Sequence, residues 1–143
     1  FRPTNDRRKP ILVAKDALGP NYPREAIAVS PQHRLLISSG PNHEEVLIPA
    51  AKLAHRKGIR RLEHKKAALY INLLMERHEI IVANGCLVET MLLTPYSTQQ
   101  MSRRHFDGQE GMRSARRIVA RDPLLDQHRI WGRPAMHPLP FAA

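Results

Sequence analysis

The chain has 143 residues, which is the length of one domain with extensions. Its 23 lysines and arginines outnumber 13 acidic residues and give a formal net charge of +10, which favours polyanionic partners. A single cysteine, Cys86, excludes internal disulfides and multi-cysteine zinc sites. Because Cys86 lies in an apolar run, we expect it to be an inert core residue. No stretch reaches the roughly 18 apolar residues that span a bilayer, so we expect no transmembrane segment.

Two explanations of the positive charge stay open. One is direct contact with RNA or an acidic surface, and the other is the general basicity of mitochondrial matrix proteins. Seventeen of the 23 cationic residues are arginines, which suit bidentate contacts and interfaces in a larger assembly. The basic start of the chain is typical of the region after a mitochondrial presequence, so we expect a location on the matrix side.

Residues 1–32 are expected to form an extended basic arm. Five of the chain's twelve prolines fall here, and they leave only short apolar pieces at 11–14 and 25–29. Because the apolar pieces recur between prolines, we favour an arm that lies on another surface; the alternative is a disordered tail.

The segment from 33 to 57 predicts a strand and then a short helix. Consecutive apolar residues predict a strand at 33–39, which Gly40-Pro41-Asn42 ends. Residues 44–57 carry helix-like spacing. Pro49 is tolerated only in the first turn of a helix, so this helix would start near Ile48.

The segment from 59 to 95 gives the strongest pattern. Apolar residues at three- and four-residue steps predict an amphipathic helix over 59–78. Residues 79–89 are rich in β-branched side chains and predict a strand, with a turn or bulge at Asn84-Gly85. A further strand is predicted at 90–95.

The last third of the chain begins with a polar loop at 96–110. A second helix is predicted at 112–121, and Asp122-Pro123 would end it. A last, irregular strand is predicted at 128–137, followed by an extended tail at 138–143.

Taken together, the elements follow the order β-α-β-β-α-β, with the 44–57 helix as an insertion. This order predicts an α+β fold, the ferredoxin-like split βαβ, over residues 33–137. A purely helical chain is the alternative, but the β-branched segment around 79–95 is poor helix material.

Three short motifs carry a family resemblance. The first helix contains Arg61 and His64, the next strand contains Ala83 and Gly85, and Ala115 precedes Asp122-Pro123. Over about residues 33–141 the chain resembles YCII-related domains, which implies a ferredoxin-like fold that pairs into a dimeric α/β barrel. The resemblance also implies that His64 and Asp122 face one cleft. Cys86 departs from the family, which usually has a proline there.

If His64 and Asp122 meet, the carboxylate could orient the imidazole as a general base. The alternative is that His64 bonds locally and Asp122 caps the turn before Pro123, which would make the pair vestigial. No nucleophile or oxyanion site stands out elsewhere.

Basic residues along the chain are the other candidate site. They could contact an anionic ligand or RNA phosphates, although such residues more often cover a solvated face or an interface: Arg7, Arg8, Lys9, Arg60, Arg61, Arg103 and Arg104. Interleaved aromatics are missing, so base-specific RNA recognition is not expected. His78-Glu79 begins like a zinc motif, but Val82 stands at the second ligand position. No metal and no cofactor are expected.

The sequence therefore predicts a non-catalytic accessory subunit of a large mitochondrial assembly. The host would be a mitochondrial ribosome, through RNA phosphates, or a respiratory or ATP synthase complex, through protein contacts. The alternative is a small YCII-like lyase or hydrolase that uses His64 and Asp122.

Overall fold

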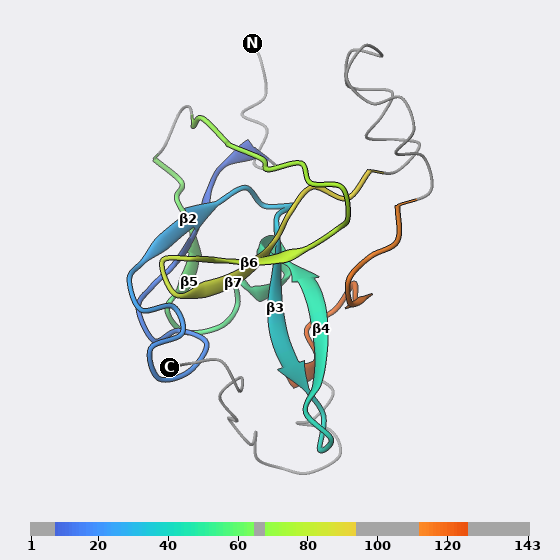
Figure 1. Cartoon of the computed structure of the whole chain (residues 1–143). Coiled ribbons are helices and arrows are strands. Elements are labelled where there is room, and N and C mark those ends of the chain that lie inside the picture. Colours follow the sequence, from blue (N-terminus) through green and yellow to red (C-terminus); the bar gives the residue numbers. More distant parts are fainter. Residues whose placement is uncertain (1–7, 65–67, 94–111, 126–143) are drawn as a thin grey trace.

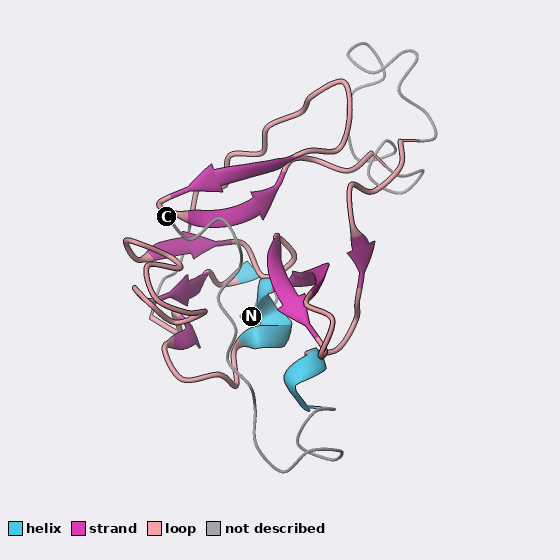
Figure 2. Ribbon diagram, turned by 60° about the horizontal axis from the view of Figure 1, so that its bottom comes forward, coloured by secondary structure: helices cyan, strands magenta, loops and turns pink. Residues whose placement is uncertain are grey.

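The computed structural model of the chain describes residues 8–64, 68–93 and 112–125. In these residues short strands form two sheets, and helix is almost absent (Figures 1 and 2). The smaller sheet has the order β2-β1-β5 and is antiparallel throughout. Its strands are β1 (Ile11–Val13), β2 (Ile27–Val29) and β5 (Ile59–Arg61).

The larger sheet has the order β6-β7-β3-β4-β8. Only its last pair, β4 with β8, is parallel. The ferredoxin-like α+β fold predicted from the element order is therefore wrong, because neither of its two helices forms. The strands of this sheet are β3 (Arg34–Ser39), β4 (Glu44–Pro49), β6 (Ile80–Ala83), β7 (Cys86–Glu89) and β8 (Arg117–Ile118).

The predicted helix over 59–78 is replaced by β5, a turn and an extended segment, with residues 65–67 outside the described residues. Ile59 is buried, but it packs from β5 against β1. Leu69 and Leu73, which belong to the same apolar stripe, are 91% and 52% exposed. A stripe at helical spacing folds as a helix only when that face meets a core, and here it does not.

The predicted helix over 44–57 is also mostly wrong. Residues 44–49 are strand β4, and only the 3-10 helix η2 (Ala50–Leu53) follows Pro49. Val46, Leu47 and Ile48 are all buried, so β4 is covered on both faces. A fully covered strand shows no alternation, and such an apolar run cannot be told from a helix by spacing alone.

Two strand predictions are confirmed. The segment 33–39 contains β3, and 79–89 contains β6 and β7 with Asn84-Gly85 as the turn between them. Both turn residues have positive φ, 50° at Asn84 and 75° at Gly85, which is the backbone that a two-residue hairpin needs. In the predicted strand 90–95, residues 90–93 are irregular and 94–95 lie outside the described residues.

The chain termini also differ from expectation. The segment expected to be an extended arm supplies β1 and β2. Its described prolines lie outside these strands, with Pro20 and Pro23 between them, Pro10 just before β1 and Pro31 just after β2. The predicted helix at 112–121 is extended and contributes the two-residue strand β8. Residues 96–110 of the predicted loop, the predicted strand at 128–137 and the tail at 138–143 lie outside the described residues.

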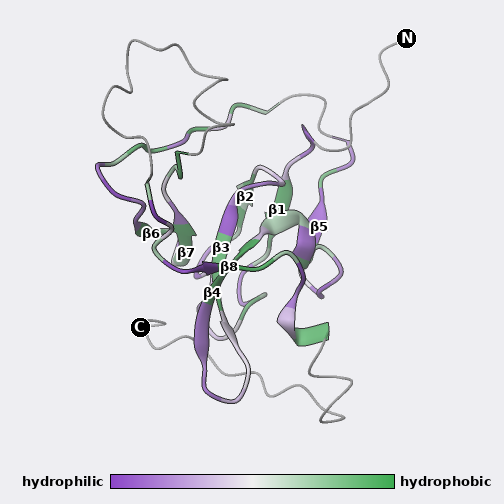
Figure 3. Ribbon diagram, turned by 90° about the vertical axis from the view of Figure 1, so that its right-hand side faces the viewer, coloured by the Kyte–Doolittle hydropathy of each residue, from purple (hydrophilic) through white to green (hydrophobic). Residues whose placement is uncertain are grey.

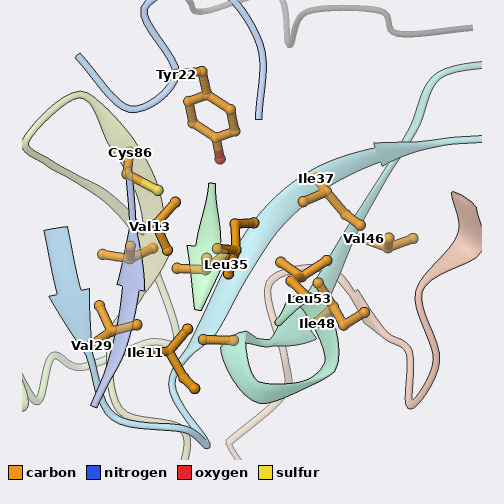
Figure 4. Packing of buried hydrophobic residues seen from close by; sticks show 13 residues of the cluster. Ile11, Val13, Tyr22, Val29, Leu35, Ile37, Val46, Ile48, Leu53 and Cys86 are labelled. Atoms are coloured by element: carbon orange, nitrogen blue, oxygen red, sulfur yellow. The ribbon is translucent and has the colours of Figure 1, made fainter. Parts of the chain in front are cut away.

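One hydrophobic cluster joins the two sheets (Figure 4). Ile11 and Val13 from β1 face Leu35 and Ile48 from the larger sheet, and all four are fully buried. In the smaller sheet β1 is the central strand, and Figure 3 shows it as hydrophobic, with the largely hydrophilic β5 beside it. The described residues contain no helix that is long and apolar enough to cross a membrane.

Candidate functional site

Glu89, the last residue of β7, gathers two histidines and an arginine. Its backbone carbonyl lies 3.0 Å from His33 Nε2. Its carboxylate accepts from the backbone N–H of Arg34 at 3.0 Å and from the Arg34 guanidinium at 3.0 Å. The same carboxylate lies 2.8 Å from Nε2 of His78, a side chain that is fully buried. The partners of Glu89 thus come from the start of β3 and from the segment before β6.

The hydrogen bonds fix the tautomers of both imidazoles. A carbonyl only accepts, so Nε2 of His33 carries a proton. His78 Nδ1 accepts from the backbone N–H of Ala115 at 2.8 Å, so that nitrogen is unprotonated and Nε2–H donates to Glu89. His78 is therefore neutral, and the single positive charge that balances the Glu89 carboxylate is the guanidinium of Arg34.

A pocket of about 260 Å3 opens beside this cluster. Its walls come from the turn before β3, from the end of β7 with the residues that follow, and from the extended segment before β6. The lining residues are Ser30, Gln32, His33, Arg34, Asn72, Glu89, Thr90, Met91 and Leu92. A turn bond from His33 N–H to the Ser30 carbonyl, 3.1 Å long, and a bond from Ala50 N–H to the His33 carbonyl, 2.9 Å long, hold the histidine in place.

Two polar groups in consecutive lining residues have no partner within the described part of the chain. Nε of Arg34 is buried and makes no hydrogen bond. His33 uses Nε2 on the Glu89 carbonyl, and no described residue bonds to its Nδ1. A buried N–H without a partner is costly, so a group that accepts from it would be bound favourably. The pocket can therefore take a carbonyl oxygen beside the guanidinium of Arg34, and Nδ1 of His33 can accept a proton from an adjacent atom.

Cys86 does not belong to this site. It is fully buried in the core cluster, which confirms that it is a core residue. Burial raises the pKa of its thiol to about 12, so it is not a thiolate near neutral pH. The neighbouring Tyr22 donates its hydroxyl to the Leu36 carbonyl, and burial raises its pKa as well. Both groups stabilise the core and are not available to a substrate.

A second ionic cluster surrounds Asp122. Arg56 donates to both carboxylate oxygens of Asp122 at 2.6 Å, and His55 Nε2 lies 2.9 Å from Oδ2. Burial alone would raise the pKa of Asp122, but the hydrogen bonds from Arg56 and the Leu124 N–H, with the charges of Arg56 and His55, hold it below its usual value. The Asp122 side chain is 0% exposed and is an ionised anchor.

His64 and Asp122, the predicted dyad, occupy different environments. His64 is exposed in the turn after β5, whereas Asp122 is buried. The bonds that Asp122 makes among the described residues go to Arg56, His55 and Leu124, and none goes to His64. Among the described residues, His64 and Asp122 therefore form no hydrogen bond or ion pair with each other.

The predicted anion-binding residues are dispersed. Lys9 pairs with Glu63 at 2.8 Å, and the carbonyl of Arg8 accepts from the Tyr70 hydroxyl at 2.6 Å. Arg60 and Arg61 lie on β5, and Arg60 is exposed. Residues Arg7, Arg103 and Arg104 lie outside the described residues.

Sequence patterns did not indicate a function for His33, Arg34, Glu89 or Ala115. His78 was noted only as the start of a zinc-motif pattern that lacks its second ligand. The available signal was position. His33 and Arg34 open a predicted strand, and Glu89 closes another. When two strands are antiparallel neighbours, as β3 and β7 are, the start of one strand lies beside the end of the other, so polar residues at these two positions come close together. In the described residues no group of three or more acidic, histidine or cysteine side chains is arranged to hold a metal ion.

The comparison with known proteins identifies one family. Residues 2–95, which are more than half of the chain, match the family model of the Hint domain. No curated protein and no solved structure matches the chain. The resemblance to YCII-related domains is therefore wrong, since its three motifs are short and two of them rest on helices that do not form.

Proposed function

The chain belongs to the Hint domain family, and on that premise we propose that it rearranges a peptide bond of its own polypeptide, with His33 moving the proton. The observation that carries this proposal is that His33 Nδ1 and Arg34 Nε, on consecutive residues that line one pocket, have no hydrogen-bond partner among the described residues. Rearranging a peptide bond requires a donor to the carbonyl oxygen and a group that returns a proton to the departing nitrogen.

The substrate bond in this proposal lies on the N-terminal side of the described chain. Tyr70 donates to the carbonyl of Arg8, the first described residue, and Asn72, two residues further on, lines the pocket. Lys9 and Glu63 hold the same end of the chain in place. Arg8 is therefore joined by a hydrogen bond to the segment whose Asn72 lines the pocket.

The proposed reaction needs no cofactor. A hydroxyl or thiol on the residue after the scissile bond attacks the preceding carbonyl carbon, whose oxygen accepts from Arg34. The carbon–nitrogen bond breaks, and an ester or thioester bond forms. His33 Nδ1 takes the proton from the nucleophile and gives it to the freed amine, so atoms and charge balance. An added thiol then releases the acyl segment.

A fusion experiment tests this proposal. A reporter protein is joined ahead of Phe1 through a Gly-Cys junction, and release of the reporter on addition of dithiothreitol is followed by intact-mass spectrometry. We expect His33→Ala to slow release by roughly 100-fold or more, the usual contribution of a positioned acid–base group. His64→Ala, an exposed histidine in a turn, is the matched control and should release the reporter at the original rate.

Two results would contradict the proposal. One is a reporter that stays attached in the unaltered fusion, and the other is equal release from the His33 and His64 variants. The Ser30→Ala variant separates sources of the nucleophile, because Ser30 carries a hydroxyl that lines the pocket. Continued release from this variant supports a nucleophile at the junction.

The accessory-subunit function remains a separate prediction. It concerns a mitochondrial location, protein neighbours in a large complex and contact with RNA phosphates, and its test is the size of the native particle and its salt dependence. Several arginines are already paired within the chain, namely Arg34, Arg56, Arg116 and Arg117. Internal pairing leaves fewer guanidinium groups for a polyanion, which is why we favour the pocket.

A further inference from the structure

Residues 115–125, which we term the strap, lie beyond the part of the chain that matches the Hint domain. The strap runs along the outer edge of the larger sheet, where β8 pairs in parallel with β4 (Figure 3). Val46 is opposite Arg117 and Leu47 is opposite Ile118. The backbone N–H of Val119 continues the pairing with a 2.9 Å bond to the carbonyl of Leu47.

Charge pairs fasten the start of the strap to the same strand. Arg116 lies 2.7 Å from Glu45, and Arg117 lies 2.9 Å from Glu44. The hydrogen bond from Arg117 lowers the pKa of Glu44, so the carboxylate stays charged over a wide pH range. Exposed pairs of this kind fix the register of the strap more than they stabilise the fold.

The other end of the strap is anchored by burial. Asp122 makes two 2.6 Å bonds to Arg56, which follows η2, and its side chain is 0% exposed. A single helical turn at 123–125 follows directly. The strap is thus held at both ends and along its middle by residues inside the matched part of the chain.

The strap reaches the candidate site through one bond. The backbone N–H of Ala115 donates to Nδ1 of His78 at 2.8 Å, and the opposite ring nitrogen donates to Glu89. Without that donor, Nδ1 would be free to take a second proton. The charged groups that face His78 are the Glu89 carboxylate and, paired with it, the Arg34 guanidinium.

We propose that the strap positions the site. By donating to His78 Nδ1, Ala115 keeps the imidazole neutral, so the Glu89 carboxylate stays paired with Arg34 while its carbonyl holds His33. Ala115 acts through two other residues and is a positioning residue. The effect of the strap on the reaction rests on the proposed function. Its effect on the protonation state of His78 does not, because that state can be measured without any reaction.

The experiment records the protonation state of His78 in the full chain by long-range proton–nitrogen NMR of the imidazole near pH 6.5. We expect an unprotonated Nδ1 in the unaltered protein. Ala115→Pro removes the N–H, so Nδ1 loses its donor and its nitrogen signal should move away from the position in the unaltered protein. Ala115→Gly keeps the N–H and should restore the original spectrum. In the reporter fusion, Ala115→Pro should slow release by roughly tenfold.

A second variant covers the case in which Ala115→Pro fails to fold. Asp122→Asn weakens the far anchor without touching the site, and it should shift His78 in the same direction by a smaller amount. A folded Ala115→Pro protein with an unchanged His78 spectrum would overturn the proposal; if that variant does not fold, an unchanged spectrum in Asp122→Asn would overturn it. A changed spectrum in fusions that never release the reporter would instead count against the proposed function alone.

Discussion

Gly85 is the residue at which we expect a single methyl group to be most damaging. Its φ is +75°, a backbone region that costs a residue with a side chain about 1–2 kcal/mol. A Cβ placed there would lie 2.7 Å from Cβ of Arg24 and 2.8 Å from its backbone nitrogen. The second contact is with backbone, so the β6–β7 hairpin has to move away from residues 24–26.

That movement breaks the bonds that hold the turn. Asn84 accepts from the N–H groups of Arg24 and Glu25 at 3.0 and 3.2 Å, and its side chain donates to the Ala26 carbonyl at 3.0 Å. At about 1 kcal/mol for each bond, losing two or three adds about 2–3 kcal/mol to the backbone term. Gly85→Ala should therefore lower the free energy of unfolding by about 3–5 kcal/mol.

Gly40 supplies the matched control. Its φ is +69° and a Cβ there meets nothing within 4 Å, so Gly40→Ala carries the backbone term of about 1–2 kcal/mol alone. Urea denaturation of both variants gives the difference directly, and we expect about 2–3 kcal/mol. If the two variants lose the same free energy within about 0.5 kcal/mol, the close approach of Gly85 to Arg24 has no energetic consequence and the reasoning fails.

Three further predictions concern the ionic and thiol groups. Glu89→Gln leaves the guanidinium of Arg34 partly buried without a charged partner, so the free energy of unfolding should fall by about 2–4 kcal/mol. Glu63→Gln, in an exposed pair, should lower it by less than about 0.5 kcal/mol, and equal losses in urea denaturation would contradict this prediction. Because the pKa of Asp122 is lowered in the folded state, its contribution is complete above the unfolded value of about 3.9 and is lost as the pH falls through the lowered value. The free energy of unfolding of the unaltered protein should therefore fall more steeply with decreasing pH below about pH 4, and that of Asp122→Asn should fall less steeply in the same range. If the two proteins show the same dependence on pH, the role assigned to Asp122 is wrong. Burial raises the pKa of Cys86 to about 12, so Ellman's reagent near pH 8 should label it only after unfolding, and rapid labelling of the native protein would show that the core is open there.

Local features were predictable where they depended on a few adjacent residues. The turn at Asn84-Gly85 was recognisable because Asn-Gly is one of the few dipeptides that tolerate positive φ at both positions. The strand at 33–39 was recognisable from its apolar run, and burial of Cys86 followed from its apolar neighbours.

The helices were not predictable from spacing, for a physical reason. The apolar residues that include Leu69 and Leu73 recur at the spacing of a helix. This spacing shows which side chains could share a helix face, but it does not show whether a core is present to cover that face. The failure at 44–57 is different, since β4 is buried on both sides and shows no alternation to recognise. Both errors led to the wrong fold class, and the wrong fold class supported the wrong family.

By itself, the sequence determined the basic charge, the absence of internal disulfides, the hairpin turn and two of the strands, because composition and local backbone preference are properties of neighbouring residues. Only the tertiary structure decided that Glu89 lies against His33, Arg34 and His78, which are separated from it by 11 to 56 residues along the chain. The strands β3 and β7 pair because both bury apolar residues in the same core, and their pairing brings the polar residues at their ends together. The site is therefore a product of sheet order, which no local pattern specifies.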